Sequence, residues 1–356
     1  MKKKLRVAIL FGGRSAEHEI SLISARNIAA AMDRKKYRLI AIGIDKQGRW
    51  FCDQGGRLLR SRSAIRVELP RHSSAAAVLS GLSSLRALET ADVVFPVLHG
   101  PFGEDGTVQG FLKLVNKPFV GAGVLGSAVG MDKDVMKRLL RDAGIPIARF
   151  MVFDSATRNK ISFARVRRAL GLPVFVKPAN LGSSVGISKA ARPAELTRAV
   201  EEAFRYDSKI VIEENISGRE IECAVLGNEN PIASVPGEII TGHAFYSYDA
   251  KYVDNKGARL VVPAELPPSA VRRVQELSVR TFQILCCSGM ARVDFFLRGP
   301  GEIFVNEINT IPGFTAISMY PKMWGATGLS YSRLIDRLIQ LALHRFRAQK
   351  RLRSSI

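Results

Sequence analysis

Residues 5–128 alternate short apolar segments with segments of helical pattern, and this alternation constrains the fold more than any other feature. Strands are predicted at Val7–Phe11, Tyr37–Ile44 and Val93–Leu98, and helices at Ser21–Met32 and Gly106–Val115. Such alternation is typical of a parallel sheet that is covered by helices. Glycines follow the predicted strands, and ligands of such folds bind at the carboxyl ends of the strands.

The rest of the chain predicts two further units. A helix at Lys133–Ala143 ends at Gly144, ahead of Pro146, which is a stop signal. A smaller α+β unit follows, with strands expected at Val174–Lys177 and Ile210–Glu214 and a helix at Pro193–Phe204. From about residue 228 we expect mainly strands until a final amphipathic helix near Tyr331–Arg345. The predicted fold class is therefore α/β and α+β, with three domains at 1–128, 129–227 and 228–356.

The composition is that of an ordinary globular protein, with 47% hydrophobic and 24% charged residues. No apolar run reaches the roughly 18 residues that would span a membrane, and Val7–Phe11 is too short for a signal peptide. The four cysteines show no metal-binding spacing, and Cys286 and Cys287 are neighbours. We therefore expect a reduced, cytoplasmic protein without a membrane partner.

The net charge of +21 raises the hypothesis of a basic nucleic-acid-binding protein. The basic residues are spread along the chain, however, and are densest at its two ends and around Arg57–Arg71. No helix-turn-helix, zinc-finger or aromatic RNA-binding pattern accompanies them, so we expect no nucleic-acid partner and keep this function as an alternative. The charge should still attract anionic small molecules such as nucleotides.

Two runs near the carboxyl end, Arg292–Phe296 and Ile303–Asn309, predict a hairpin joined by a turn-like segment. Glu307 and Asn309 are two residues apart on one strand and point to the same face, and Asp294 can lie across from them. Hard oxygen ligands in this arrangement suit Mg²⁺. A solvated hairpin edge is the alternative interpretation.

A second candidate site begins at Lys177, where a strand runs into a segment with Gly182, Ser183, Ser184 and Gly186. Small residues let backbone N–H groups approach phosphate oxygens, and the lysine adds a charge. The lysine precedes the glycines, so this is not a Walker A loop, and an ordinary Gly-Ser turn is the alternative.

Two acidic segments could complete a nucleotide site. The strand end Glu213–Ile216 can present backbone groups to an adenine, and Glu220 can present a carboxylate to ribose, although an exposed acidic strand end is the alternative. The long polar segment Gly237–Val262, which holds Lys251 and Tyr252, has few regular signals and is expected to be a lid or binding loop.

Taken together, these segments resemble a known family. The matching segments are Phe11–Ser21, His99–Gly106, Met131–Lys133, Lys177–Gly186, Tyr248–Tyr252 and Glu307–Gly313. In order and spacing they are similar to a D-alanine–D-alanine ligase of the ATP-grasp superfamily. The resemblance covers nearly the whole chain and implies a three-domain ATP-grasp architecture with an N-terminal parallel-sheet domain.

The resemblance implies the ATP-dependent joining of two D-alanines through a D-alanyl phosphate, for peptidoglycan precursor synthesis. The implied cofactors are ATP and two Mg²⁺ ions, with Mn²⁺ as a substitute, and the implied metal ligands are Asp294, Glu307 and Asn309. It also implies a homodimer that forms through the first domain. A related ligase that makes D-Ala–D-lactate is the alternative within the same fold, and Tyr252 favours an amine acceptor over a hydroxy acid.

The roles of the nucleotide-binding residues also come from the resemblance. Lys133 and Lys177 would contact the α/β-phosphates, and Lys251 would reach the γ-phosphate. The loop with Gly182, Ser183 and Ser184 would close over the nucleotide. Glu213 and the backbone of Glu214, Asn215 and Ile216 would meet the adenine, and Glu220 the ribose.

The implied amino-acid site has its own set. Glu17 would anchor the ammonium of the first D-alanine, with His99 near the same subsite. Arg292 and the Gly313 N–H would stabilise the oxyanion, and Ser318 would bind the second D-alanine. Glu17, Ser183 and Tyr252 would form a hydrogen-bonded set that ties the domains together and offers a proton path.

Overall fold

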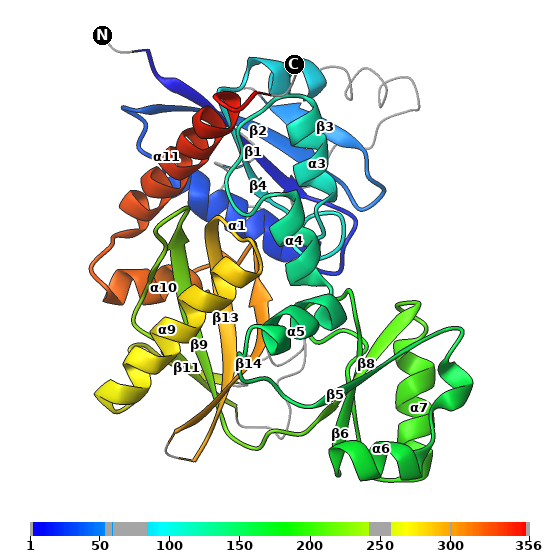
Figure 1. Cartoon of the computed structure of the whole chain (residues 1–356). Coiled ribbons are helices and arrows are strands. Elements are labelled where there is room, and N and C mark those ends of the chain that lie inside the picture. The colour runs from blue at the N-terminus through cyan, green and yellow to red at the C-terminus, as the bar shows by residue number, and fades with distance from the viewer. Residues whose placement is uncertain (1–2, 54–58, 60–83, 242–257, 300, 354–356) are drawn as a thin grey trace.

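The structure is a computed structural model that describes residues 3–53, 59, 84–241, 258–299 and 301–353 (Figure 1). The strands of the described residues form three sheets, and helices pack against them. The N-terminal sheet lies near the two chain ends, and the central sheet lies at the opposite end of the molecule. The third sheet lies next to the central sheet.

The N-terminal sheet has the order β3-β2-β1-β4. Its strands are β1 (Leu5–Gly12), β2 (Tyr37–Ile44), β3 (Trp50–Asp53) and β4 (Val93–Val97). β1 pairs in parallel with β2 and β4, and only the edge strand β3 is antiparallel. The predicted parallel sheet is therefore confirmed.

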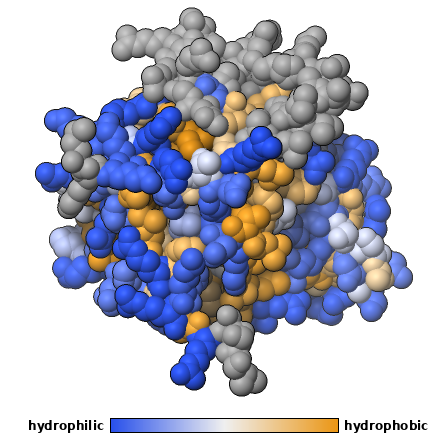
Figure 2. Space-filling view, turned by 90° about the horizontal axis from the view of Figure 1, so that it is seen from above, coloured by the Kyte–Doolittle hydropathy of each residue, from blue (hydrophilic) through white to orange (hydrophobic). Residues whose placement is uncertain are grey.

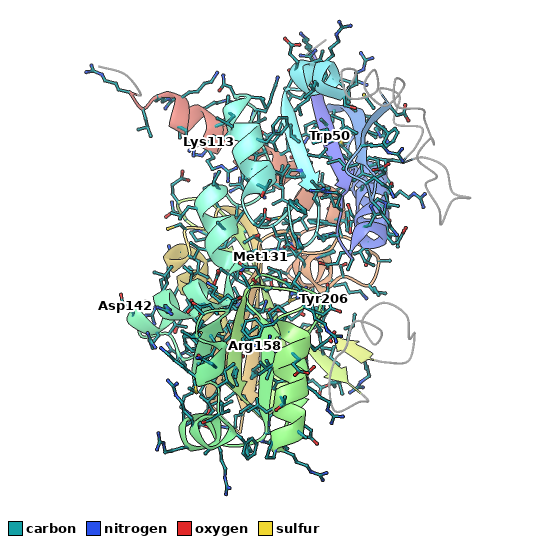
Figure 3. The ribbon with its side chains drawn as sticks, turned by 90° about the vertical axis from the view of Figure 1, so that its right-hand side faces the viewer. Trp50, Lys113, Met131, Asp142, Arg158 and Tyr206 are labelled. Carbon is teal, nitrogen blue, oxygen red and sulfur yellow. The ribbon has the colours of Figure 1, made fainter. Side chains whose placement is uncertain are left out.

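Both faces of this sheet are covered. Val7 and Ile9 of β1 pack on the side of α1 (His18–Ala31), and Ala8 packs on the side of α3 (Thr107–Leu114). Alternate residues of a strand point to opposite faces, so burial on both sides explains why β1 is a continuous apolar run. α4 (Val124–Met131) then leads out of this region, and Met131 lies between the upper and lower parts of the molecule (Figure 3).

The central sheet has the order β5-β8-β6-β7, with antiparallel pairing throughout. Its strands are β5 (Phe150–Asp154), β6 (Val174–Pro178), β7 (Ser188–Ala190) and β8 (Lys209–Glu214). Its helices are the short 3-10 helix η2 (Arg158–Lys160), α6 (Phe163–Leu170) and α7 (Pro193–Ala203). The preceding helix α5 (Lys133–Asp142) packs its buried residues Met136 and Leu140 into the core of the third sheet. The strands and helices predicted for this region are confirmed.

The third sheet has the order β12-β11-β9-β13-β14, with β10 beside β9. Its strands are β9 (Arg219–Gly227), β10 (Ile232–Ala233), β11 (Gly237–Thr241), β12 (Ala258–Val261), β13 (Gly289–Arg298) and β14 (Glu302–Asn309). The antiparallel pairing of β13 with β14 confirms the predicted hairpin.

One expectation for this region was wrong. The chain forms a long helix, α9 (Pro268–Ile284), and a short one, α10 (Met319–Ala326), where mainly strands were expected. Residues Ala270, Val274 and Leu277 of α9 are buried and lie on one helical face. The two ends of the expected binding loop, Gly237–Val262, form β11 and β12, which pair with each other, and residues 242–257 between them lie outside the described residues.

The last helix, α11 (Tyr331–Lys350), returns to the N-terminal sheet. Its buried residues Leu334, Leu338 and Ile339 share one core with Val7 of β1 and Trp324 of α10. α11 therefore joins the first and third sheets into one packed body, as its diagonal course in Figure 1 shows.

Hydrophilic side chains cover most of the face seen in Figure 2, with apolar side chains gathered towards its centre. In the part of the chain that the structure describes, no helix is long and apolar enough to cross a membrane.

Candidate active site

Two pockets meet between the three sheets. The first is lined by residues of the predicted amino-acid site, namely Glu17, His99, Ser183, Arg292, Asn309, Gly313 and Ser318. The second is lined by residues of the predicted nucleotide site, namely Lys133, Lys177, Ser184, Glu213, Glu214, Asn215, Ile216, Glu220 and Asp294. Gly182, Glu222 and Glu307 line both pockets. Two ligands bound here would therefore meet at Glu307 and the glycine loop.

The β13–β14 hairpin brings the predicted metal ligands together. Asp294 pairs with Glu307 in the strand register, and Arg292 pairs with Asn309. The amide of Asn309 donates to Asp294 Oδ2 at 3.0 Å. A register shift after Asp294 bends the ladder at this point, as bulges near functional sites often do.

Arg292 holds a cluster of carboxylates on the same sheet. Its Nε and one terminal nitrogen each donate to Asp294 at 2.7 Å, and Nε lies 3.0 Å from Glu222 Oε2. Burial acts to lower the pKa of Arg292, but the carboxylates of Asp294 and Glu222 outweigh it and raise the pKa well above its usual value. Arg292 therefore stays charged at the junction of the two pockets.

This cluster fits a divalent cation in its chemistry. Two carboxylates and one amide oxygen from Asp294, Glu307 and Asn309 are hard ligands of the type that Mg²⁺ takes. Among the described residues, no group of three or more His, Cys, Asp or Glu side chains is arranged as a metal site. The carboxylates instead face cations of the protein, since Lys133 Nζ lies 3.6 Å from Glu307 Oε2.

Lys133 is placed by the start of α5. Its Nζ donates to the carbonyl of Leu181 at 2.5 Å, directly before the glycine loop. The N-cap residue Asp132 accepts from the backbone N–H groups of Asp134 and Val135, which fixes the first turn. The sequence of α5 therefore places a buried lysine between the glycine loop and Glu307.

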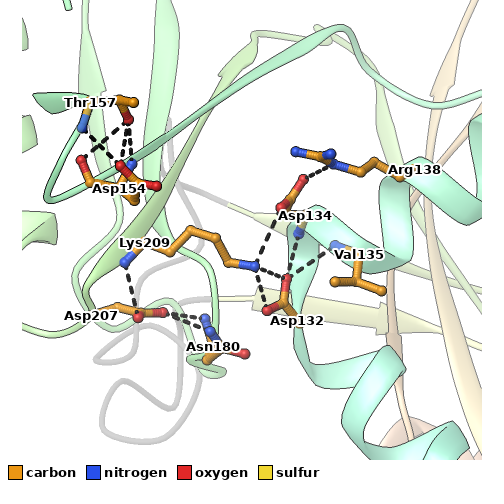
Figure 4. Close-up of polar contacts among 9 residues, drawn as sticks. All are labelled: Asp132, Asp134, Val135, Arg138, Asp154, Thr157, Asn180, Asp207 and Lys209. Carbon is orange, nitrogen blue, oxygen red and sulfur yellow. Dashed lines mark hydrogen bonds and ion pairs between the residues drawn. The ribbon is translucent and has the colours of Figure 1, made fainter. Parts of the chain in front are cut away.

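A polar network fixes this arrangement to the central sheet (Figure 4). Lys209 of β8 pairs with Asp132 at 2.7 Å and with Asp134 at 3.3 Å. Asp207 accepts from the backbone N–H and the side-chain amide of Asn180, at 2.7 and 3.0 Å. The base of the glycine loop and the start of α5 are thus held by neighbouring residues of one loop and strand.

Glu213 lies between two lysines and is only 2% exposed. Lys177 Nζ lies 2.7 Å from Glu213 Oε2, and Lys137 Nζ lies 3.2 Å from Oε1. Burial acts to raise the pKa of Glu213, but the two ammonium groups outweigh it and lower the pKa to about 2. Burial lowers the pKa of Lys137, against the attraction of Glu213. Sequence analysis missed Lys137, which looks like any other helical lysine.

In the amino-acid pocket, the hydroxyl of Ser183 donates to Glu17 Oε1, which joins the glycine loop to the start of α1. The predicted contact between these two residues is therefore present in the structure. Ser183 and Ser184 both have positive φ, at 52° and 61°, which is uncommon for residues with a side chain and marks a specialised loop. Lys251 and Tyr252 lie outside the described residues.

Glu104 is a second carboxyl group in this pocket that sequence analysis did not assign, although the matching segment contains it. Burial and the neighbouring carboxylate of Glu17 raise the pKa of Glu104 to about 8. Burial also lowers the pKa of His99, so its imidazole is neutral. Only the fold shows that these groups line the same cavity.

The far wall of the amino-acid pocket is the turn before α10. Ser318 accepts from the N–H of Thr315 at 2.9 Å. A Cβ atom at Gly313 would lie 2.7 Å from Ser318 Oγ, so a side chain at this position would displace the Ser318 hydroxyl. Gly313 and Ser318 are therefore in contact, as two groups that serve one substrate would be.

Two family models match the chain. The model described as "D-ala D-ala ligase N-terminus" matches residues 6–122, and the model "D-ala D-ala ligase C-terminus" matches residues 139–340. Together they cover most of the described sheets and both pockets.

Whole proteins and solved structures give the same result. The chain is 51% identical to a D-alanine--D-alanine ligase of Shouchella clausii over 362 residues, 99% of this chain and 98% of that protein. It is 50% identical to D-alanine--D-alanine ligase A of Escherichia coli (strain K12), over 99% of this chain and 100% of that protein.

Among solved structures, the D-alanine-D-alanine ligase from Coxiella burnetii superposes with a TM-score of 0.82 at 40% identity, over 98% of each chain. The VanG D-Ala:D-Ser ligase from Enterococcus faecalis superposes with a TM-score of 0.80 at 35% identity, over 96% of this chain and 100% of that chain.

Proposed function

The chain belongs to the D-alanine–D-alanine ligase family, and we propose that it joins two D-alanines to D-alanyl-D-alanine with ATP as the energy source. The observation that supports this function best is the meeting of the nucleotide pocket and the amino-acid pocket at Gly182, Glu222 and Glu307. A reaction that transfers a phosphoryl group to an amino acid needs this adjacency. The product is a precursor of peptidoglycan.

The nucleotide occupies the pocket between the central and third sheets. Lys133 and Lys177 neutralise the α- and β-phosphates, and the loop at Gly182, Ser183 and Ser184 covers them with its backbone. Adenine lies against the strand end formed by Glu213, Glu214, Asn215 and Ile216, and the ribose against Glu220. The position of these residues around one cavity supports the assignment. Lys251, outside the described residues, is assigned to the γ-phosphate.

Asp294, Glu307 and Asn309 would hold two Mg²⁺ ions, and Mn²⁺ would substitute for them. When bound, the metal would neutralise phosphate oxygens that accumulate charge during phosphoryl transfer. The oxygen donors of the facing strands β13 and β14 support this assignment. Removal of divalent ions with EDTA should abolish turnover, and Mg²⁺ should restore it.

The first D-alanine binds with its ammonium at Glu17, near His99. Its carboxylate attacks the γ-phosphate, ADP leaves, and an acyl phosphate forms. Ser318 binds the carboxylate of the second D-alanine, whose amine then attacks the carbonyl carbon, and phosphate leaves. Arg292 and the Gly313 N–H stabilise the oxyanion. Glu17, Ser183 and Tyr252 offer a path for the proton of the incoming amine, and the contact of Ser183 with Glu17 supports that path.

The other candidate functions lose support. Relatives of about 50% identity over the whole chain are D-alanine–D-alanine ligases, which does not favour a D-lactate acceptor or nucleic-acid binding. The similarity to a D-Ala:D-Ser ligase shows that this fold also serves an amine acceptor other than D-alanine. Acceptor choice is therefore part of the test below.

We further propose a cytoplasmic homodimer that forms through the first of three domains (1–128, 129–227 and 228–356). Leu114 at the end of α3 is 88% exposed, and Leu125 in the neighbouring α4 is 60% exposed. Exposed leucines on adjacent helices support a contact between subunits here. Light scattering on the purified protein measures the oligomeric state directly.

The function is tested by phosphate release from ATP and Mg²⁺, with mass spectrometry of the products. The reactions contain D-alanine, L-alanine, D-alanine with D-lactate, D-alanine with D-serine, or no amino acid. We expect release that requires D-alanine and yields D-alanyl-D-alanine. A depsipeptide as the main product, or no turnover by folded protein in any reaction, would contradict the proposal.

A further inference from the structure

The carboxyl group of Glu104 connects two loops of the amino-acid pocket that lie far apart in the sequence. Its Oε2 accepts from the backbone N–H of Gly100 at 2.8 Å, and its Oε1 accepts from the N–H of Ile311 at 3.0 Å. Each oxygen therefore receives one main-chain bond. Among the described residues, no side chain donates a hydrogen bond to either oxygen.

His99 holds the same part of the second loop from the other side. Its Nδ1 lies 3.0 Å from the carbonyl oxygen of Ile311, which can only accept, so Nδ1 carries the proton. Ile311 is thus bound at both its N–H and its C=O by one short loop of the first sheet. Two such bonds fix the position of a peptide group far better than one.

The loop that is held in this way leads directly into the site of the second D-alanine. Gly313 follows Ile311 by two residues, and its Cα hydrogens face Ser318 Oγ so closely that a Cβ would lie 2.7 Å away. A shift of Ile311 would therefore move the Gly313 N–H and disturb Ser318. The geometry needed for the oxyanion depends on the loop from Ile311 to Gly313.

We propose that Glu104 is a positioning residue, which clamps the loop 311–313 to the loop 99–104 and so places the Gly313 N–H for catalysis. This assignment rests on the proposed ligation. It differs from the roles given to Glu17 and His99, because Glu104 acts through backbone groups and not through contact with substrate.

Charges in the pocket couple this clamp to substrate. Burial and the carboxylate of Glu17 disfavour the ionised form of Glu104, and the charge of Arg292 favours it. A substrate ammonium bound at Glu17 offsets this repulsion. Binding of the first D-alanine therefore favours the carboxylate form of Glu104, which accepts from both N–H groups.

The variants Glu104→Gln and Glu104→Ala test the clamp. The glutamine has one acceptor oxygen, so it keeps one of the two bonds, and the alanine loses both. We expect kcat to fall about tenfold in Glu104→Gln and about a hundredfold in Glu104→Ala, since small misplacements have effects of this size. The KM for ATP should stay within about twofold, because Glu104 does not line the nucleotide pocket.

Glu195→Ala is the matched control for Glu104→Ala. Glu195 also accepts two backbone N–H bonds, from Ala191 and Arg192, both at Oε2, but it lies at the start of α7 and lines neither of the two pockets. Its substitution should leave kcat unchanged. An equal loss of kcat in Glu195→Ala and Glu104→Ala would contradict a specific role for Glu104.

Hydrogen exchange gives a readout that does not depend on turnover. The amide of Gly100 or of Ile311 should exchange faster in Glu104→Gln, and both should do so in Glu104→Ala. Faster exchange with unchanged kcat, or lower kcat with unchanged exchange, would overturn the proposal. A parallel rise in the KM for ATP with a lower melting temperature would also overturn it. If the unsubstituted protein has no ligase activity, the proposed function fails, and the exchange data still decide whether the clamp exists.

Discussion

At the scale of single residues, Glu213 has a buried carboxylate that pairs with two buried lysines. One negative charge lies between the ammonium groups of Lys177 and Lys137, and all three side chains are less than 10% exposed. Removing Glu213 would leave two buried ammonium groups without a counter-charge, which is strongly destabilising, whereas removing one lysine would leave a neutral pair. The surplus positive charge on the Lys177 side faces the nucleotide pocket, where an anion would complete the group.

We predict that Glu213→Gln lowers the free energy of unfolding by about 3 kcal/mol at pH 7, because Lys137 and Lys177 lose their buried counter-charge. In the unsubstituted protein the pKa of Glu213 is lowered to about 2, below its unfolded value near 4.5. The unfolded chain therefore binds the proton first, and stability is lost as the pH falls from about 4.5 towards 2. The variant lacks this carboxyl group and has none of this stabilisation to lose. The difference between the two proteins should shrink with acid, as measured by urea unfolding at pH 7, 5 and 3.5.

Lys160→Met is the control for this measurement. Lys160 is an exposed lysine of η2 with no ion pair among the described residues, so its loss should change stability by less than about 0.5 kcal/mol. Equal unfolding midpoints for Glu213→Gln and Lys160→Met would show that the buried charges do not stabilise each other.

Among the helices and strands, the turn between β14 and α10 links backbone geometry to function most directly. A Cβ at Gly313 would lie 2.7 Å from Ser318 Oγ, whereas a Cβ at the exposed Gly325 of α10 would have no such neighbour within 4 Å. Alanine variants of the two glycines therefore separate the general effect of replacing a glycine from the effect of displacing Ser318.

We predict that Gly313→Ala reduces kcat at least about tenfold, because the methyl group displaces the Ser318 hydroxyl. Gly325→Ala should keep full activity and raise the free energy of unfolding by up to about 0.5 kcal/mol, since alanine favours the helical conformation in the last turn of α10. Steady-state rates and urea unfolding of both variants provide the comparison. Full activity of Gly313→Ala would show that the pocket tolerates the methyl group.

The strands and helices with strong local signals could be predicted from the sequence. β2 was predicted to the residue and β14 to within one residue, whereas β1 and β13 extend one to three residues beyond the predicted ends; their β-branched and apolar runs end at glycines or turns. α9 was missed although its buried residues follow helical spacing, since the expectation of strands outweighed that signal. The short strands β11 and β12 owe their form to pairing with each other and with β9.

The site was predictable where a residue type reveals its chemistry in a local segment. Asp294, Glu307 and the glycine loop are of this kind. Glu104, Lys137 and Glu222 are not, because their partners come from distant parts of the chain. The N–H that binds Glu104 Oε1 belongs to Ile311, 207 residues away. No local pattern contains such a contact.

At the scale of the whole molecule, α11 packs in one core with β1 and α10, so we expect it to couple the unfolding of the first and third sheets. Arg345 near its end donates to the carbonyl oxygens of Phe119 and Gly121, at 2.8 and 2.5 Å, and to Ser288 Oγ. Its guanidinium also lies 4.7 Å from the centre of the Phe119 ring. Among the described residues no carboxylate pairs with it, and burial lowers the pKa of Arg345 to about 10. Arg345 thus binds two carbonyl groups of the segment that follows the first sheet, and the hydroxyl of the residue directly before β13.

The chain has two tryptophans, which report on the two halves that α11 joins. Trp50 lies in β3 of the first sheet, in the upper part of Figure 3, and Trp324 is buried in α10. Replacing each in turn by phenylalanine gives proteins with a single fluorescent probe. Because one core contains residues of β1, α10 and α11, we predict that both probes report the same urea midpoint.

In each of the two single-tryptophan proteins, Arg345→Met should lower the urea midpoint by the same amount. We expect the free energy of unfolding to fall by about 2–4 kcal/mol, because several buried carbonyl and hydroxyl groups lose their donor. Arg347→Met provides the control on the same helix, since Arg347 is exposed and should change stability by less than about 0.5 kcal/mol. If Arg345→Met lowered the midpoint seen by Trp50 and left that of Trp324 unchanged, the two halves would be independent folding units, and α11 would belong to only one of them. A common shift would show instead that the last helix makes the two sheets one cooperative body, so that the amino-acid pocket between them keeps its shape only while both are folded.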